Sequence, residues 1–227
     1  MIPLVSCLCP TMPGREGFLD RALACFAGQD YPYLEMVVIC DLGMARRYGG
    51  SASRPVRMVA SRAGLSLGEK RNLGVQWADG QIICHFDDDD VSQTDRVSHQ
   101  VSLLRNSSKA VVGYHTITVE ETRSIQVMEA SGERPGARWW IMHVPGGGAA
   151  GTSLCYRKEW ALRHPFPPVT GGEDDRFYTE ALDAGEALAV DGEHRICATN
   201  HAGNCSKRLI GGVWWTELER SPYDTTV

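Results

Sequence analysis

The sequence has no run of apolar residues long enough to cross a membrane, which takes about 20 residues. Its first residues, Met1 to Ser6, also lack the basic region and long apolar stretch of a signal peptide. Positive charge is scarce too, because 23 basic side chains stand against 28 acidic ones, for a net charge of −5. These absences argue against a membrane span and against broad electrostatic binding of nucleic acid, and we expect a cytoplasmic protein.

No C-x-x-C pair occurs among the eight cysteines. Most of them lie in apolar stretches, as Cys40 does after Val38 and Ile39, so we interpret them as small buried hydrophobic residues in a reducing compartment. The alternatives are a disulfide framework, which is typical of shorter secreted chains, and a metal site at Cys7 and Cys9. Neither is needed for stability, because a chain of 227 residues buries about 70–75% of its unfolded surface.

Apolar runs alternate with helical patterns over the first half of the chain. Short runs bounded by turn residues predict strands, and apolar residues three or four apart predict helices. The predicted strands cover residues 4–9, 36–40, 56–60 and 82–86, and the predicted helices cover 15–29, 68–79 and 93–105, the last capped by Ser92. Strands alternating with helices in this way form parallel sheets with right-handed crossovers, so we expect an α/β fold with a mostly parallel central sheet.

The second half has a less regular pattern. Residues 109–127 are rich in β-branched side chains and predict two or three strands, whereas 130–150 show no clear periodicity and indicate a functional or mobile loop. Strands are also predicted at 151–156, 187–190 and 195–199, and a helix at 173–184. We assign Leu182 of this helix to its inner face; the earlier helix carries Leu73, Trp77 and Ala78. The last twenty or so residues, with Trp214 and Trp215, are not assigned to an element.

The strongest local signal is the run Asp87-Asp88-Asp89-Asp90, which directly follows a predicted strand. Adjacent carboxylates repel one another, so such a run is tolerated where water or a cation offsets its charge. It lies at the end of a sheet strand, where open α/β sheets bind ligands. Its oxygens suit Mg²⁺ or Mn²⁺, with diphosphate oxygens and water filling the other positions. The alternative is a solvated acidic turn that caps the next helix.

Complementary positive charge stands at the start of the preceding predicted helix. Lys70 and Arg71 are suited to hold a phosphate there, or else they belong to an exposed charged turn. Thr11 and Asp41 follow strands predicted to end at the same edge of the sheet. Asp41 is suited to accept hydrogen bonds from a nucleobase or to cap a turn.

A separate carboxylate follows the flexible pair Gly171-Gly172. Asp174 lies at a predicted helix start, where an acid either serves the helix dipole or, in an inverting group transfer, takes the proton of an acceptor hydroxyl. His201 follows a late strand and is either structural or a further contact to metal or phosphate. The residues alone therefore predict a metal-and-phosphate site that faces a separate carboxylate.

In their order these motifs resemble glycosyltransferase family 2. The resemblance rests on Pro10-Thr11, Gln29-Asp30-Tyr31-Pro32 before 35–39, 70–75 through Ala78-Asp79-Gly80 to 86–90, Arg96, 151–153 with 156–158, and Glu173-Asp174, and it spans nearly the whole chain. It implies a GT-A fold, which is a Rossmann-like three-layer sandwich. It also implies one domain over residues 1–227, in which about 1–105 bind a nucleotide sugar and about 106–227 hold the acceptor and the catalytic base.

The resemblance further implies a chemistry. A hexosyl or related group would pass from a nucleotide-diphosphate sugar, with a UDP-sugar favoured, to an acceptor hydroxyl by direct displacement with inversion, with Mn²⁺ or Mg²⁺ as cofactor. The implied donor-binding residues are Pro10, Thr11, Asp41, Lys70, Arg71, Asp87, Asp88 and Glu173; the implied metal ligands are Asp89, Asp87 and His201; and the implied catalytic base is Asp174 or Asp175.

Individual roles follow by position. Thr11 and Asp41 would contact the nucleoside, Arg71 the diphosphate, and Asp88 the ribose or the sugar. The four consecutive aspartates leave the register between Asp87 and Asp89 open. His201 with Asn204 and Ser206 is similar to the late His-x-x-Asn stretch of some family members, which adds a contact on the donor side.

The acceptor is not identified by the sequence. A soluble glycan, a small molecule, a protein side chain and a modified nucleobase all stay open. Trp139, Trp140, Trp214 and Trp215 are suited to stack on a sugar or a base, or to fill the core. The arginines at 46, 47, 54 and 57 form a basic stretch that we interpret as a solvated loop rather than a polyanion site.

Two other functions are considered. A nucleotidyltransferase would normally carry a glycine-rich phosphate loop after the first strand, and Thr11 to Arg15 matches such a loop poorly. A non-catalytic module that binds a sugar nucleotide or a metal would not depend on Asp174. Replacing Asp174 by Asn therefore separates an enzyme from such a module.

Overall fold

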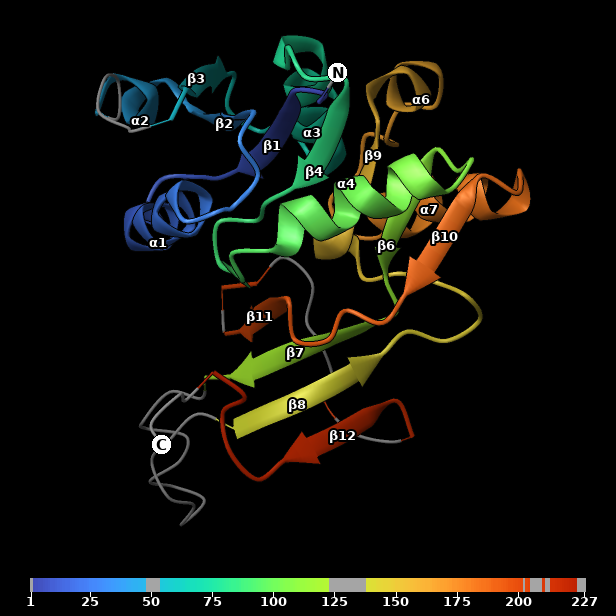
Figure 1. Ribbon diagram of the computed structural model, residues 1–227. Coiled ribbons are helices and arrows are strands. Elements are labelled where there is room, and N and C mark those ends of the chain that lie inside the picture. Colours follow the sequence, from blue (N-terminus) through green and yellow to red (C-terminus); the bar gives the residue numbers. More distant parts are fainter. Residues whose placement is uncertain are drawn as a thin grey trace.

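The computed structural model describes residues 2–47, 54–122, 138–201, 203, 204, 210 and 213–223. A seven-stranded sheet carries helices on both faces, and a five-stranded sheet lies below it in the view of Figure 1. Among the described residues, no helix combines the length and the apolar character needed to span a membrane.

The central sheet has the strand order β10-β6-β9-β4-β1-β2-β3. Its strands are β1 (Val5–Pro10), β2 (Leu34–Asp41), β3 (Val56–Ser61), β4 (Ile82–His85), β6 (Val111–Tyr114), β9 (Cys155–Arg157) and β10 (Ala187–Val190). Neighbouring strands run parallel except at β9, which is antiparallel to both β4 and β6. The predicted α/β fold with a mostly parallel central sheet is confirmed.

Two layers of helices cover this sheet. One face packs against α1 (Glu16–Ala27), α2 (Leu42–Arg47) and α4 (Arg96–Asn106), and the other against α3 (Leu67–Trp77), α6 (Lys158–Arg163) and α7 (Glu173–Asp183). Alternate side chains of β1 serve the two faces, because Cys7 and Cys9 join the first core cluster and Leu8 joins the second. The cysteines that the structure describes are free and mostly buried, as expected of small hydrophobic residues.

The smaller sheet has the order β12-β8-β7-β11-β5. Its strands are β5 (Val91–Ser92), β7 (Thr116–Glu121), β8 (Arg138–His143), β11 (Ile196–Asn200) and β12 (Trp215–Leu218). β7 lies between β8, to which it is antiparallel, and β11, to which it is parallel. This sheet brings the C-terminal part of the chain against the segment that follows the aspartate run.

Several sequence predictions are corrected here. Ser92 belongs to β5 and caps no helix; its hydroxyl accepts a hydrogen bond from Arg96 at 2.8 Å, and Asp95 occupies the N-cap position of α4. Leu182, assigned to the inner face of its helix, is 39% exposed and does not face the core. Part of the predicted loop at 130–150 is the strand β8, and the predicted strand at 151–156 is the 3₁₀ turn η1 (Gly151–Ser153) followed by β9.

Candidate active site

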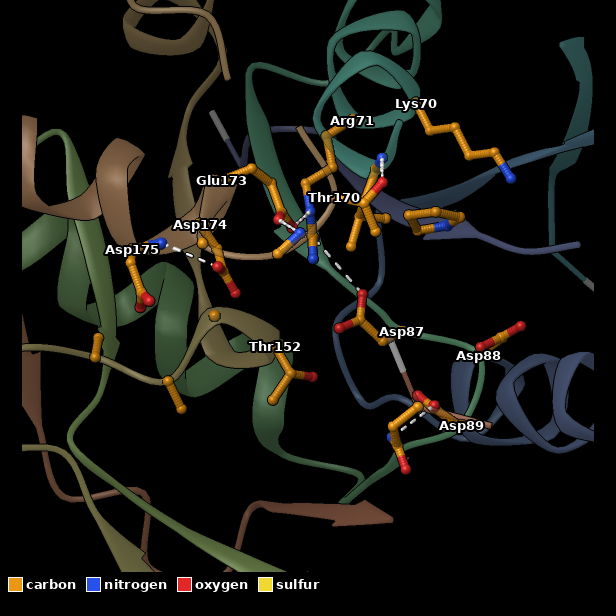
Figure 2. A pocket seen from close by; sticks show the side chains of 18 of the residues that line it. Lys70, Arg71, Asp87, Asp88, Asp89, Thr152, Thr170, Glu173, Asp174 and Asp175 are labelled. Carbon is orange, nitrogen blue, oxygen red and sulfur yellow. Dashed lines mark hydrogen bonds and ion pairs between the residues drawn. The ribbon is translucent and has the colours of Figure 1, made fainter. Parts of the chain in front are cut away.

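A cavity of about 490 Å³ opens at the carboxyl ends of β1 and β4. The starts of α3 and α7 form part of its wall, and the loop from Val144 to Thr152 together with β8 and β12 forms the rest. Figure 2 shows the acidic and basic side chains that converge on it. The position agrees with the general rule that open α/β sheets bind ligands beyond the carboxyl ends of their strands.

Arg15 joins two members of the aspartate run. Its Nε donates to Oδ2 of Asp88 at 2.9 Å, and its Nη2 donates to Oδ1 of Asp88 at 2.7 Å and to Oδ2 of Asp89 at 2.5 Å. The Thr11 hydroxyl adds a hydrogen bond to Oδ2 of Asp88 at 2.6 Å. Burial alone would lower the pKa of Arg15, but the hydrogen bonds and charges of the two carboxylates raise it above its ordinary value. A cation of the chain itself thus offsets their charge.

Asp89 also faces the segment after β11. Its Oδ2 lies 3.1 Å from Nε2 of His201 and accepts a hydrogen bond from Nδ2 of Asn204 at 3.2 Å. The His201 ring stacks on Phe18, with 4.7 Å between the ring centroids. His201 and the aspartate run, which are more than 100 residues apart in the sequence, therefore meet here.

The pair formed by Asp89 and His201 is a candidate for holding a divalent cation. Among the residues that the structure describes, no three His, Cys, Asp or Glu side chains gather to form a metal site by themselves. Adjacent ligands of an octahedral ion with bonds of about 2.1 Å lie about 3.0 Å apart. The 3.1 Å between Oδ2 of Asp89 and Nε2 of His201 is close to that spacing and is also the length of an ordinary hydrogen bond, and the same oxygen accepts hydrogen bonds from Arg15 at 2.5 Å and Asn204 at 3.2 Å. The carboxylate and imidazole donors are of the kinds that bind Mn²⁺ and Mg²⁺, and a cation held by them would take its remaining ligands from phosphate oxygens and water.

The buried Arg71 links the aspartate run to the start of α7. Its Nε donates to Oε1 of Glu173 at 3.2 Å, and its Nη1 lies 2.6 Å from Nδ1 of His85 and 3.6 Å from Oδ1 of Asp87. Burial, and next the charge of Arg71, lower the pKa of His85 well below its usual value, so His85 is neutral. Burial raises the pKa of Asp87, although Arg71 opposes the rise. The Arg71 guanidinium thus lies between two carboxylates, Asp87 after β4 and Glu173 at the start of α7, and interacts with both.

The fourth aspartate, Asp90, stabilises the backbone around the cavity. Asp90 accepts hydrogen bonds from the Thr152 hydroxyl and, at 3.2 Å, from the backbone N–H of Thr199. The buried Arg96 donates to the carbonyl oxygens of His85 at 2.6 Å and Thr152 at 2.7 Å. Together these bonds fix the end of β4 relative to η1 and β11.

Lys70 reaches the cavity from the first turns of α3. A capping box of Ser66 and Glu69 starts this helix, and the backbone N–H of Gly68 donates to the carbonyl of Val169 at 3.1 Å. These contacts hold α3 against the segment that leads into α7. The Lys70 ammonium donates to the carbonyl of Thr11 at 2.8 Å. Within the described part of the chain it has no carboxylate partner, so its charge is available to a ligand.

The start of α7 presents two further carboxylates. Gly172 precedes the helix in the left-handed conformation, with φ of 74°, which explains a glycine at this turn. Oδ1 of Asp174 accepts a hydrogen bond from the backbone N–H of Asp175 at 3.0 Å, and Figure 2 shows Asp174 on the side facing Asp87, with Asp175 farther away. Desolvation, followed by the charges of Asp174 and Glu173, raises the pKa of Asp175.

Gly151 lies directly against Asp174. A Cβ atom added at Gly151 would be 1.4 Å from Oδ2 of Asp174 and 2.8 Å from its Cβ. Only a residue without a side chain allows η1 to approach the carboxylate this closely. The backbone of η1 therefore limits the orientations available to Asp174.

Most of the residues predicted from the sequence converge on the cavity. Those lining it are Pro10, Thr11, Lys70, Arg71, Asp87, Asp88, Asp89, Glu173, Asp174 and Asp175. Asp41 ends β2 and is partly buried, but it is not among the described residues that line the cavity. His201 is not among them either and reaches the site through Asp89. Ser206 and the side chains of Arg46 and Arg47 lie outside the described residues.

Sequence reasoning missed Arg15 and the wall formed by Met142 to Pro145. Arg15 stands in the loop after β1, 73 positions before Asp88, so no local spacing reveals their contact. The usable signal was the position of the loop, because the ends of adjacent parallel strands β1 and β4 must meet at one edge of the sheet. Met142 and His143 belong to β8, whose sequence has no recognisable period.

Comparison with known proteins concerns the family and the fold of the chain. The sequence model described as glycosyl transferase family 2 matches residues 10–144, more than half of the chain. A comparison with curated proteins finds no match. Among solved structures, the chain is similar to Staphylococcus aureus TarS 1-349 in complex with UDP-GlcNAc, with a TM-score of 0.63 and 18% identity over 91% of this chain and 62% of that one.

A second similar structure is the mannosyltransferase PcManGT from Pyrobaculum calidifontis in complex with GDP-Man and Mn²⁺. Its TM-score is 0.67 and its identity 19%, over 89% of this chain and 59% of that one. At such identities the likeness concerns the fold, and the fold is that of the GT-A transferases expected from the sequence. The chain spans 36–62% of the length of these and the other similar TarS structures.

Proposed function

This chain belongs to glycosyl transferase family 2, and we propose that it transfers a sugar from a nucleotide-diphosphate donor to an acceptor hydroxyl, with inversion at the anomeric carbon. Family membership supports glycosyl transfer in general. One observation carries the finer proposal: the cavity places Asp87 to Asp89 and Lys70, which has no carboxylate partner among the described residues, opposite a separate carboxylate, Asp174. Donor binding and proton transfer require these two groups of residues.

The donor half of the site is assigned from charge. Lys70 offers its ammonium to the diphosphate, because its partner in the structure is the carbonyl of Thr11 rather than a carboxylate. Arg71 is already paired with Glu173 and Asp87, and from this buried position it adds positive potential to the cavity. Its direct contact with the diphosphate, like the contact of Asp41 with the nucleoside, stays a prediction.

Thr11 and Asp88 are hydrogen-bonded to each other and belong to the part that holds the nucleoside and the sugar. A UDP-sugar is the favoured donor. Support comes from TarS, which was solved with UDP and with UDP-GlcNAc, while PcManGT was solved with GDP-Man. Both nucleotides therefore belong in the first binding screen.

Asp89 and His201 are the residues that would hold Mn²⁺ or Mg²⁺, with Asp87 as a further ligand. When bound, such a cation offsets the charge that develops on the departing diphosphate. The structure of PcManGT with Mn²⁺ supports a divalent cation in this fold. Arg15 already places one positive charge on Asp88 and Asp89, so the chain lowers the repulsion within the run before any ligand arrives.

Asp174 acts as the base in this proposal. It accepts the proton of the acceptor hydroxyl while the acceptor oxygen forms a bond to the anomeric carbon. The bond from that carbon to the diphosphate oxygen breaks, and its electron pair leaves with the nucleoside diphosphate. No covalent bond to the protein is needed. Asp175 is the alternative base, and it lies farther from the aspartate run (Figure 2).

The test compares Asp174→Asn with Asp175→Asn. We expect Asp174→Asn to keep nucleotide-sugar affinity and to lower nucleoside-diphosphate release in the presence of an acceptor panel by about 10²–10⁴-fold, the usual contribution of a general base. Asp175→Asn should keep most of the activity. If the two results are exchanged, Asp175 is the base.

Other outcomes would refute the proposed function. A wild-type protein that binds a nucleotide sugar but never releases nucleoside diphosphate is a binding module. One that releases pyrophosphate from a nucleoside triphosphate and a sugar phosphate is a nucleotidyltransferase.

A further inference from the structure

The cavity has a further wall to which the proposed donor and base residues do not belong. β8 and β12 supply it, through Met142, Trp214 and Trp215, with Val144 and Pro145 continuing it. Trp215 pairs with Met142 across the two strands and packs against the third core cluster. Trp214 is different, because half of its surface is exposed.

The backbone that carries this exposed indole is anchored. The N–H of His143 donates to the carbonyl of Trp214 at 2.8 Å, which holds the main chain just before β12. A large aromatic surface in the lining of a cavity lies in water until a ligand covers it. Trp214 therefore has the features of a stacking platform rather than of a core residue.

Charge around this wall is one-sided. The lysine and arginines that line the cavity are Arg15, Lys70 and Arg71, all on the donor side, and the two arginines are paired with carboxylates. Asp174 and Asp175 line the same cavity, and the wall itself contributes His143, whose Nε2 lies 3.3 Å from the Thr216 hydroxyl. Among the described residues this wall has no lysine or arginine, so an anionic group bound there would share the cavity with two carboxylates and have no permanent positive charge beside it.

We propose that the wall of Met142, Val144, Pro145, Trp214 and Trp215 is the acceptor subsite and that it takes an uncharged saccharide, with one sugar face stacked on Trp214. A sugar ring suits this wall because its C–H face is apolar and can stack on an indole, while its rim carries hydroxyls that can reach Asp174. The described part of this wall supplies no lysine or arginine to bind the phosphate of a phosphorylated sugar or a nucleic acid. The inference deepens the proposed function and rests on it.

The experiment uses the full chain saturated with whichever of UDP, GDP, CDP and dTDP binds it, in the presence of Mn²⁺. Saturation-transfer NMR then measures binding of methyl glucoside, methyl mannoside, N-acetylglucosamine, maltose and cellobiose, and of glucose 6-phosphate and mannose 6-phosphate. We expect a neutral saccharide to bind about tenfold more tightly than the phosphates. Trp214→Ala should weaken that binding about tenfold, and Trp214→Phe should retain most of it.

Trp77→Ala is the matched control, because Trp77 is equally exposed but lies at the end of α3, outside the cavity lining. It should leave saccharide binding unchanged, and nucleotide affinity should be the same in all variants. Equal saccharide binding by wild type and Trp214→Ala, equal binding of the sugar phosphates, or no binding of any neutral sugar to the nucleotide-loaded protein would each overturn the inference while leaving the proposed function standing. If no nucleotide binds, the proposed function fails and the inference fails with it.

Discussion

Arg15 offers the sharpest prediction about the aspartate run. Its guanidinium contacts Asp88 and Asp89 at 2.5–2.9 Å, and the three side chains are only 13%, 4% and 12% exposed. Removing one partner of a buried ion pair costs about 3–5 kcal/mol, because the other charge is left uncompensated. Thr11, His201 and Asn204 still contact these carboxylates, so we expect Arg15→Ala to cost about 3 kcal/mol in metal-free buffer, at the lower end of that range.

The same variant reports on the proposed cation. If Mn²⁺ binds at Asp89, it supplies the charge that Arg15→Ala removes, and we expect the loss to shrink to about 1 kcal/mol at saturating Mn²⁺. The assay is thermal unfolding of both proteins with chelator and with Mn²⁺, where about 3 kcal/mol corresponds to a shift of about 6–12 °C for a chain of this size.

Arg62→Ala is the control for this assay, because Arg62 forms a surface ion pair with Glu69 and its side chain is 78% exposed. Its loss should be within about 0.5 kcal/mol in both buffers. The reasoning is refuted if Arg15→Ala loses less than about 1 kcal/mol with chelator, or if its loss is equally large with Mn²⁺.

Two predictions concern the start of α7. Gly151→Ala should lower transfer about tenfold or more at unchanged donor affinity, because the new Cβ would force Oδ2 of Asp174 aside, and initial rates check this against Gly43→Ala, where no atom lies within 4 Å. Full activity in Gly151→Ala would contradict the assignment of Asp174. The raised pKa of Asp175 means that its charged form is disfavoured in the folded state, so Asp175→Asn should raise the melting temperature at pH 7. That gain should fade as the pH drops through the folded pKa toward 3.8; a gain that persists unchanged at pH 4 would count against this electrostatic cause.

Much of the central sheet was predictable because β1, β2 and β4 are short apolar runs buried on both faces, with helical periods between them. In the smaller sheet, β7 and β11 lie where strands were predicted, within 109–127 and at 195–199. Strands β8 and β12 were not predicted, because the sequence of β8, Arg-Trp-Trp-Ile-Met-His, has no alternation and its partner β12 lies more than 70 positions away. Pairing at that distance is decided by tertiary packing, which a local pattern does not contain.

The residues of the candidate site also fall into those that the sequence could place and those that it could not. The aspartate run and Lys70 could be placed at one sheet edge because they follow predicted strands or begin the helices between them. The clamp by Arg15 and the approach of Gly151 to Asp174 depend on loop conformations, and neither residue type signals its partner. Asp41 shows the converse case, since its strand end was predicted correctly but its side chain is not among those that line the cavity.

The cavity is expected to bind a nucleotide-diphosphate sugar. Isothermal titration calorimetry of the wild-type chain with UDP-GlcNAc, GDP-mannose, CDP-glucose and dTDP-glucose, each with Mn²⁺, with Mg²⁺ and with chelator, measures this binding. We predict that one nucleotide class binds and that its binding weakens when the metal is removed, with a matching rise in stability of about 2.7 kcal/mol at a donor concentration of about 100 Kd. If no donor binds to a protein that unfolds cooperatively and is therefore folded, the cavity is not a donor site.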